Sequence, residues 1–285
     1  IQNLAREIAA LQKEFTLVRG NLEDPATIAH AFQLLKGERV AADTGTRVVH
    51  LAAQAGVRHS IEHPEEFIQS NIVGFHNVIE ACRTHGVGGL IYASTSAVYG
   101  DNKEVPFHEN HRTDAQVSLY GMTKKANELE ASVYHHLFGV RVTGLRFFTV
   151  YGPWGRPDMA LFLFTDAILR GSAMQIFGEG RMRRDFTFID DIVAGVIAAV
   201  DSNLENEIIN LGRGKPEELM DFVAAIERAC GGEGTKEFLP MQPGDVVQTS
   251  ADTTKAKRLL RYEPETSIVE GIPKFVAWYR EYHGV

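Results

Sequence analysis

One strand-like segment carries three hydroxyl groups to a single place. Residues 89–96 are largely apolar until they end in Ser94, Thr95 and Ser96. A continuous apolar run of this length is typical of a parallel strand that is buried on both faces. The hydroxyls are therefore expected at the carboxyl end of that strand, which is the edge where open α/β sheets bind ligands.

Tyr120 and Lys124 lie four residues apart in segment 118–137, whose spacing predicts a helix, so the two side chains share one helix face. A nearby ammonium stabilises a phenolate and lowers the pKa of the phenol, which predicts Tyr120 as a general base. Thr95 could relay the proton. Taken alone, this spacing more often means an exposed tyrosine and a solvated lysine. The hydroxyl-ended strand upstream favours the catalytic interpretation.

The composition is that of an ordinary soluble globular protein. The 285 residues are 44% hydrophobic and 23% charged, and the net charge of −8 argues against a nucleic-acid surface. Cys82 and Cys230 lie in amphipathic helical patterns and are expected to be free thiols in a reducing compartment. No apolar run reaches membrane-spanning length and no signal peptide begins the sequence, so we expect a cytoplasmic protein without a metal site.

The order of the expected elements predicts an α/β fold: a Rossmann-type doubly wound parallel sheet over residues 1–152, and a smaller mixed α/β domain over 153–285 with segments returning to the first. Strands are expected at 15–20, 46–53, 89–96 and 140–149, and helices at 1–13, 66–85 and 118–137. The second region is expected to hold helices at 159–169, 191–201, 216–231 and 267–282, and strands at 175–178, 186–189 and 207–212.

The hydroxyl run, the Tyr120 and Lys124 pair, and the strand end Arg-Phe-Phe-Thr-Val-Tyr-Gly-Pro at 146–153 together resemble the extended short-chain dehydrogenase/reductase family of sugar-nucleotide epimerases. The resemblance runs from about Phe15 to the C-terminus. It implies NAD as cofactor, with Thr95, Tyr120 and Lys124 as the catalytic residues. The family's Gly-rich turn, which binds the pyrophosphate, is not found. We therefore expect further residues before residue 1, and poor dinucleotide binding without them.

The resemblance also implies cofactor contacts. The small residues from 51 to 55 would let the backbone approach NAD, although tight helix–sheet packing would explain them equally well. Asn21 stands where relatives usually have Asp, and its amide can still bond the adenine edge. The implied cofactor-binding residues are Asn21, Leu22, Leu51, Ala52, Ala53, Gln54, Asn71, Ala93, Ser94, Tyr120, Lys124, Phe147 and Phe148.

By the same resemblance, Arg184 would bind the diphosphate of a nucleotide sugar, because its planar guanidinium bonds phosphate oxygens in pairs. A solvated arginine loop is the simpler alternative for residues 181–184. Phe177 would lie near the uracil. Gln242 and Asp245 would close over the nucleotide, with Asp245 on its ribose.

The residues after the strand indicate the reaction. Dehydratases and decarboxylases of the family carry a carboxylate next to the catalytic hydroxyl, whereas this chain has Ala97 after Thr95 and Ser96. Without that acid the site can oxidise and re-reduce a sugar carbon but has little to drive elimination. The sequence therefore favours 4-epimerisation.

The segment from Phe147 to Ala160 resembles that of UDP-glucuronate 4-epimerases, which implies UDP-glucuronate as substrate and UDP-galacturonate as product. Arg58, Ser96, Thr149 and Arg156 could hold the sugar carboxylate. Arg156 could instead pair locally with Asp158. The alternatives are a UDP-hexose 4-epimerase, a UDP-glucuronate decarboxylase and a non-catalytic nucleotide-binding relative.

The resemblance further implies a homodimer. The helices expected at 66–85 and 118–137 would pair with their copies as a four-helix bundle. Leu129, Val133 and Leu137 are apolar positions that could point outward into such an interface.

Overall fold

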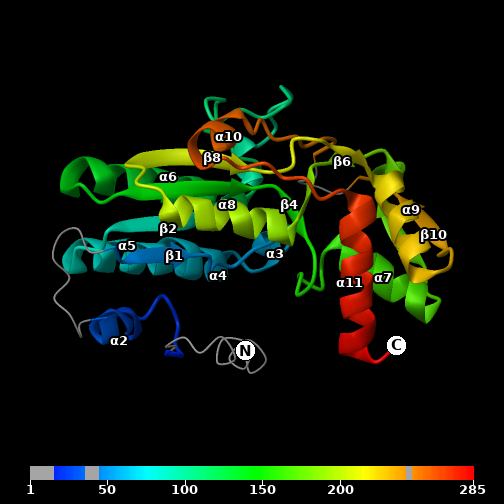
Figure 1. Cartoon of the computed structure of the whole chain (residues 1–285), viewed down its shortest axis with the longest axis horizontal. Helices are drawn as coiled ribbons and strands as arrows, with labels where there is room; N and C mark the ends of the chain where they lie inside the picture. The colour runs from blue at the N-terminus through cyan, green and yellow to red at the C-terminus, as the bar shows by residue number, and fades with distance from the viewer. Residues whose placement is uncertain (1–15, 36–44, 242–245) are drawn as a thin grey trace.

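The structure is a computed structural model, and it describes residues 16–35, 45–241 and 246–285. Its largest sheet, among these residues, is parallel and has the strand order β1-β2-β3-β8. The strands are β1 (Arg47–His50), β2 (Gly89–Thr95), β3 (Val142–Phe147) and β8 (Asn206–Leu211). Because β8 comes from the second half of the chain, the chain crosses back to complete the sheet (Figure 1).

Helices cover both faces of this sheet. Side chains of α2 (Pro25–Leu34), α5 (Gly74–His85) and α6 (Leu119–Phe138) form one buried apolar cluster with Leu90 and Tyr92 of β2. Side chains of α8 (Ile189–Asp201) and α10 (Thr254–Leu260) form another cluster with Ile91. Since successive residues of a strand point to opposite faces, β2 is buried on both sides. The predicted doubly wound α/β fold is confirmed.

Two predictions at the start of the chain have other outcomes. Residues 16–20 form no strand, although a strand was predicted at 15–20. Apolar character alone does not make a strand, because the backbone groups need a neighbouring strand to pair with, and β1 pairs only with β2 among the described residues. The helix predicted at 1–13 lies outside the described residues.

The helix predicted at 66–85 is interrupted. It consists of α4 (Pro64–Phe67), a π-helical turn η2 (Ile68–Val73) and α5. A short helix, α3 (His59–Glu62), precedes it. π-Helical turns change the direction of side chains within a helix and are frequent at functional sites. Here the π turn carries Asn71.

The second unit packs three helices around small sheets. Its helices are α7 (Ala160–Arg170), α9 (Leu219–Cys230) and α11 (Ile268–His283). Its strand pairs are β4 (Thr149–Tyr151) with β7 (Phe186–Phe188), β5 (Met174–Phe177) with β10 (Lys236–Leu239), and β6 (Arg183–Arg184) with β9 (Glu217–Glu218). A 3-10 turn, η4 (Gly178–Gly180), follows β5.

Two boundaries here differ from the sequence-based ones. Helix α9 begins at Leu219 instead of residue 216, because Glu217 and Glu218 pair with β6. The strand predicted at 140–149 divides into β3 and β4, because Thr149 leaves the main sheet and pairs with Phe186.

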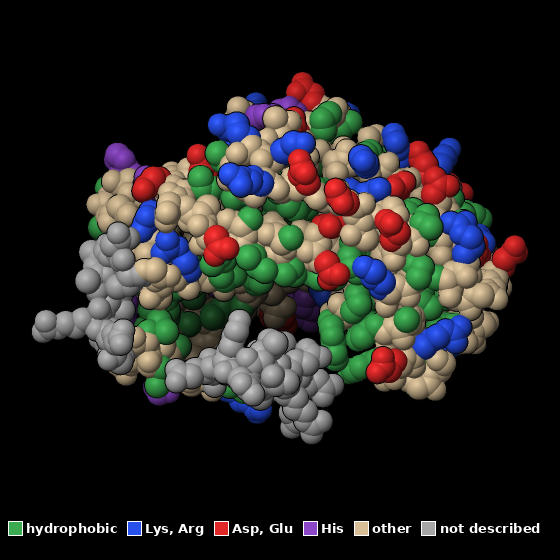
Figure 2. All heavy atoms as spheres, viewed as in Figure 1, with side chains coloured by type: hydrophobic (Ala, Val, Ile, Leu, Met, Phe, Trp, Pro, Cys, Tyr) green, Lys and Arg blue, Asp and Glu red, His purple; other side chains and the backbone are tan. Residues whose placement is uncertain are grey.

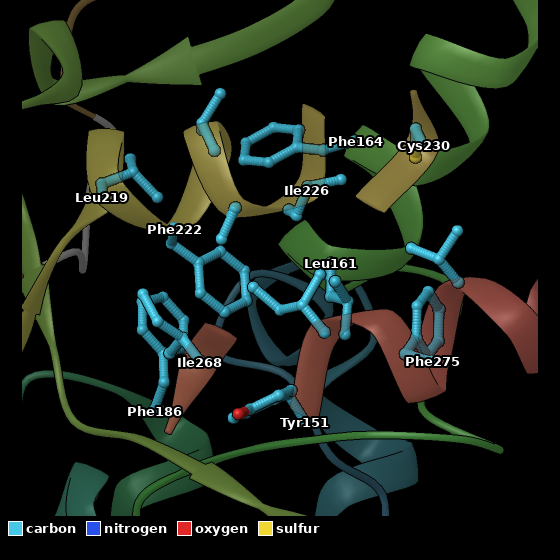
Figure 3. Close-up of a cluster of buried hydrophobic side chains, with 14 of the residues drawn as sticks. Tyr151, Leu161, Phe164, Phe186, Leu219, Phe222, Ile226, Cys230, Ile268 and Phe275 are labelled. Carbon is cyan, nitrogen blue, oxygen red and sulfur yellow. The ribbon is translucent and has the colours of Figure 1, made fainter. Parts of the chain in front are cut away.

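Aromatic packing holds the second unit together. Phe186 of β7 and Phe222 of α9 stack with ring centroids 3.8 Å apart. Tyr151 contacts both rings edge-on, and its hydroxyl donates to the Ser267 carbonyl at 3.1 Å (Figure 3). Ser267 also caps α11 through a reciprocal capping box with Glu270, so the start of α11 is attached to this core.

Replacing Phe222 with alanine is expected to lower the free energy of unfolding by about 3–5 kcal/mol, because a fully buried ring is lost and a cavity remains. Leu163→Ala on the exposed side of α7 is the matched control, with an expected change within about 0.5 kcal/mol. Urea unfolding followed by circular dichroism measures both. Equal effects of the two variants would contradict this core.

Candidate active site

The end of β2 meets the start of α6. Ser118 caps α6, its hydroxyl accepting from the Gly121 N–H at 3.0 Å, which places Tyr120 in the first helical turn. The Thr95 hydroxyl accepts from the Ala97 N–H at 3.2 Å, where a 3-10 turn, η3 (Ser96–Tyr99), begins. The Thr95 and Tyr120 side chains are hydrogen-bonded. Since the Thr95 oxygen already accepts, its own proton is available for the Tyr120 oxygen.

The pKa of Tyr120 is raised from its usual value, because burial disfavours the charged phenolate. The hydrogen bond from Thr95 and the positive charge of Arg156 act in the opposite direction. Among the described residues, no carboxylate contributes to this shift. The rise in the Tyr120 pKa caused by burial is thus opposed by one hydrogen-bond partner, Thr95, and one cation, Arg156.

The effect predicted for Lys124 on Tyr120 stays a prediction, because this structure shows Lys124 in another contact. The Lys124 ammonium is buried and donates to the Ala93 carbonyl at 2.9 Å, and it is not among the groups that shift the pKa of Tyr120. Burial lowers the pKa of Lys124 to about 8. Its hydrogen bond ties α6 to the end of β2, and the cation that acts on Tyr120 is Arg156.

His50, at the end of β1, was missed by the sequence analysis. The side chain is only 5% exposed and contacts the Phe75 ring edge-on, with the two ring centroids 5.5 Å apart. Burial, with the positive charge of Lys124, lowers the pKa of His50 to about 4, so the imidazole is neutral at physiological pH. A lone histidine that ends an apolar strand was the available signal.

Asn71 holds the loop that follows β1. Its side-chain oxygen accepts from the Gln54 N–H at 2.8 Å, and its amide donates to the Gln54 carbonyl and the Thr123 hydroxyl, both at 3.0 Å. Asn127 of α6 donates to the Asn71 carbonyl at 2.7 Å. Leu51, Ala52 and Ala53 precede Gln54, and Leu51 is 52% exposed. The Asn71 hydrogen bonds therefore fix the loop while leaving an apolar surface open to a ligand.

A buried ion pair lies behind the strand end. Arg146 of β3 donates to both carboxylate oxygens of Glu128 at 2.8 Å, and the Ser94 hydroxyl donates to the same carboxylate at 2.7 Å. The Ser94 side chain is therefore engaged within the protein. The sequence signal was Glu128, one helical turn after Lys124 on the same face of α6. The sequence analysis passed over it.

Arg156 comes from the loop between β4 and α7. Its guanidinium makes a two-pronged ion pair with Asp158 at 2.9 and 2.5 Å, as the local alternative predicted. It also faces the loop after β1, because a Cβ added at Gly56 would lie 3.3 Å from Arg156 Nη2. Thr149 and Arg156 both line a hollow of about 360 Å³, which includes its open mouth. Arg156 thus pairs locally with Asp158 and also acts on Tyr120 through its positive charge.

The structure brings together Arg58, predicted to hold the sugar carboxylate, and Phe177, predicted to lie near the uracil. The Arg58 guanidinium lies over the Phe177 ring, 5.0 Å from its centre. Arg184 donates to the carbonyls of Arg183 and Val247 at 3.0 and 3.1 Å, next to the undescribed segment 242–245.

The other predicted residues are spread around this edge of the sheet. Asn21 is exposed, and Leu22 is held through its carbonyl, which accepts from Asn77 at 2.8 Å. Ser96 and Phe147 are half-buried. Phe148 is buried against the rings of Tyr99 and Phe107, so its side chain belongs to the core. Gln242 and Asp245 lie outside the described residues.

One group outside this site has metal-ligand chemistry. His59, Glu62 and His63 on and after α3 have ligand atoms within 4.8 Å of one another, and the group is exposed. Within the described ranges no other such group occurs, and no second observation points to a bound ion here.

The arrangement suits a dinucleotide. A hollow opens in the middle of the face shown in Figure 2, below β1 and α3 and beside α11, with apolar side chains on its walls. It lies at the β1 side of the parallel sheet, and crevices at the carboxyl ends of parallel strands hold nucleotides in doubly wound folds. Leu51, Ala52, Ala53 and the Ala93 strand end fit a cofactor; the Ser94 hydroxyl does not. No described helix has the length and apolar character needed to cross a bilayer.

Doubly wound parallel sheets bind nucleotides at the carboxyl ends of their strands, where Thr95 lies in this chain. Residues 2–212 match the NAD dependent epimerase/dehydratase family, and the chain belongs to this family. A probable UDP-glucuronate 4-epimerase of Rhizobium meliloti is 42% identical, over 96% of this chain and 84% of that protein.

Two crystal structures have nearly the same fold as this chain. The UDP-glucuronic acid 4-epimerase of Bacillus cereus, with UDP-glucuronic acid and NAD, has a TM-score of 0.86 at 33% identity and covers 96% of this chain and 85% of its own. The UDP-glucose 4-epimerase of Thermotoga maritima, with UDP-glucose, has a TM-score of 0.85 at 30% identity, over 93% and 84%. The fold alone therefore does not separate the two substrates.

The stability of the protein is expected to fall as the pH drops from 6.5 to 4. In the unfolded chain His50 takes up a proton near pH 6.5, but in the folded protein only near 4. Unfolding therefore binds a proton between these values, which removes up to about 3 kcal/mol. Urea unfolding of wild type and His50→Gln at four pH values measures the difference. Parallel pH profiles for the two proteins would contradict the assignment.

Proposed function

We propose that this protein is an NAD-dependent epimerase that interconverts UDP-glucuronate and UDP-galacturonate at C4. One observation carries the proposal: the Arg156 guanidinium lies between Thr149 and the Gly56 loop, where its positive charge acts on the buried Tyr120. The carboxylate of a uronate is attached to C5, next to the reacting C4. A cation beside the general base is therefore within reach of that carboxylate.

Tyr120 exchanges the proton of the C4 hydroxyl. The Thr95 hydroxyl donates to the Tyr120 oxygen and stabilises the phenolate that must form. Arg156 stabilises the same negative charge, so both groups oppose the burial that raises the pKa. When bound, NAD supplies the acceptor for the C4 hydride and returns it to the other face of the ring. Leu51, Ala52, Ala53 and Lys124 would line its site.

Holding the carboxylate protects the intermediate. A 4-keto uronate is a β-keto acid, which loses carbon dioxide when its carboxylate turns out of the ring plane. Arg156 is a two-pronged donor suited to a carboxylate, and a substrate carboxylate would take the place of the exposed Asp158 that it holds in this structure. Thr149 and Ser96 offer hydroxyls from neighbouring strand ends. Arg58 over Phe177 would face the nucleotide side of the sugar, with Arg184 on the diphosphate. Gln242 and Asp245 remain predicted nucleotide contacts.

Incubation of the full-length, NAD-loaded protein with UDP-glucuronate is expected to yield UDP-galacturonate, measured by chromatography and NMR. Tyr120→Phe should lower kcat by about 10²–10⁴-fold, because the proton acceptor is lost, while UDP binding is kept. UDP-xylose or a 4-keto pentose as main product would assign a decarboxylase instead. Absence of both turnover and of NAD after denaturation would indicate a non-catalytic relative.

A UDP-hexose 4-epimerase is the second candidate, favoured by the similar fold of the Thermotoga maritima enzyme. The variant Arg156→Ala separates the two. Either enzyme should lose the part of its rate that the Arg156 charge contributes through the Tyr120 phenolate. An enzyme for neutral hexoses should keep its KM and release no decarboxylated product, whereas an enzyme that holds a uronate should also show a raised KM or release a decarboxylated product.

We also propose a homodimer through α5 and α6. Helix α6 exposes an apolar stripe in which Leu129, Val133 and Leu137 are 58%, 50% and 62% exposed. The two helices are joined in one protomer by the His76–Glu130 contact at 2.7 Å, so they present one shared surface. Apolar side chains at such spacing are typical of a helix that packs on another helix.

The double variant Leu129→Glu, Leu137→Glu is expected to sediment as a monomer at micromolar concentration, since buried charges would oppose the helix pairing. Leu163→Glu on α7 changes an equally exposed leucine elsewhere and should leave the mass unchanged. A monomeric wild type in the same sedimentation run would overturn the proposed dimer.

A further inference from the structure

The turn between β4 and α7 contains a tryptophan in an unusual backbone conformation. The Gly155 N–H donates to the Gly152 carbonyl at 3.1 Å, which closes a four-residue turn with Pro153 second and Trp154 third. Trp154 has a φ of 64°, in the left-handed region. The third position of such a turn normally holds Gly or Asn, because a bulky side chain is strained there. Contacts elsewhere must therefore hold Trp154 in place.

Helix α11 provides these contacts. The Trp154 ring centroid lies 5.3 Å from that of Trp278 and 5.3 Å from that of Tyr282. Trp278 and Tyr282 stack on each other at 5.3 Å with an interplanar angle of 21°. We call these three rings the aromatic clamp. α11 is itself fixed in the core by Phe275 and Tyr279, which are 1% exposed, so the clamp rests on a rigid element.

Trp154, the ring of the aromatic clamp that belongs to the loop, lies two residues before Arg156 in the sequence. From the same loop, the Arg156 guanidinium reaches Asp158 and the neighbourhood of Gly56, and its positive charge acts on Tyr120. Arg156 is thus held by its own loop on one side and faces the candidate active site on the other. A small displacement of a charged group beside a reacting centre can cost about two orders of magnitude in rate.

We infer that Trp154 is a positioning residue: the aromatic clamp holds the 152–158 loop on α11 and thereby sets the Arg156 guanidinium beside Tyr120, where it selects a sugar with a carboxylate. The selection rests on the proposed function. The clamp itself does not, because it follows from the turn and the ring contacts alone.

Two variants of the full-length, NAD-loaded protein test the inference. Trp154→Asn introduces a residue that tolerates the left-handed turn but has no aromatic ring, whereas Trp154→Phe retains an aromatic ring. Trp154→Asn should raise the KM for UDP-glucuronate about 10-fold, because the carboxylate loses its partner. Its inhibition constant for UDP, which has no carboxylate, should change less than 2-fold. Trp154→Phe should restore most of the UDP-glucuronate affinity.

Hydrogen exchange of residues 152–159 provides a readout that needs no activity. Exchange should be faster in Trp154→Asn than in wild type and near wild type in Trp154→Phe. Equal exchange in all three proteins, or an equal loss of UDP and UDP-glucuronate affinity in Trp154→Asn, would overturn the clamp. If the wild-type protein does not turn over UDP-glucuronate, only the proposed function is refuted. The hydrogen-exchange experiment still tests whether the aromatic clamp holds the 152–158 loop.

Discussion

Burial of the Tyr120 hydroxyl is the constraint on which the site depends. A phenol that leaves water resists ionisation, and the structure shows this as a raised pKa. The groups that oppose the shift come from two distant parts of the chain: Thr95 at the end of β2 and Arg156 after β4. A phenolate therefore becomes accessible only where the sheet unit and the second unit meet, which is also where a sugar nucleotide would bind.

Much of the surrounding structure keeps these elements in register. Lys124 ties α6 to the end of β2 through the Ala93 carbonyl, and the neutral His50 packs beside it without adding charge. The π turn directs Asn71 toward Gln54, so one amide joins the loop after β1 to α6. The buried Lys124 and Asn71 side chains are paired with protein atoms, which is what makes their burial tolerable.

In the proposed function, the second unit contributes the group that would distinguish substrates. Family membership and fold are shared with enzymes for neutral and for acidic sugars, so the distinction must come from single side chains. The proposal assigns this role to Arg156, whose loop contains a turn with Trp154 at φ 64° in contact with Trp278 of α11. On this proposal, substrate choice would depend on packing outside the sheet.

The sequence by itself determined the α/β class and most helix and strand positions, because hydrophobic periodicity is a local property, and its hydroxyl run and i to i+4 spacing predicted Thr95, Tyr120 and Lys124 as the catalytic set. It erred at residues 16–20, because strand pairing depends on distant partners. Only the tertiary structure joined Arg156 to Tyr120, buried His50 beside Lys124 and placed Trp154 on α11. Desolvation and long-range contacts decide these features, and neither can be read from neighbouring residues.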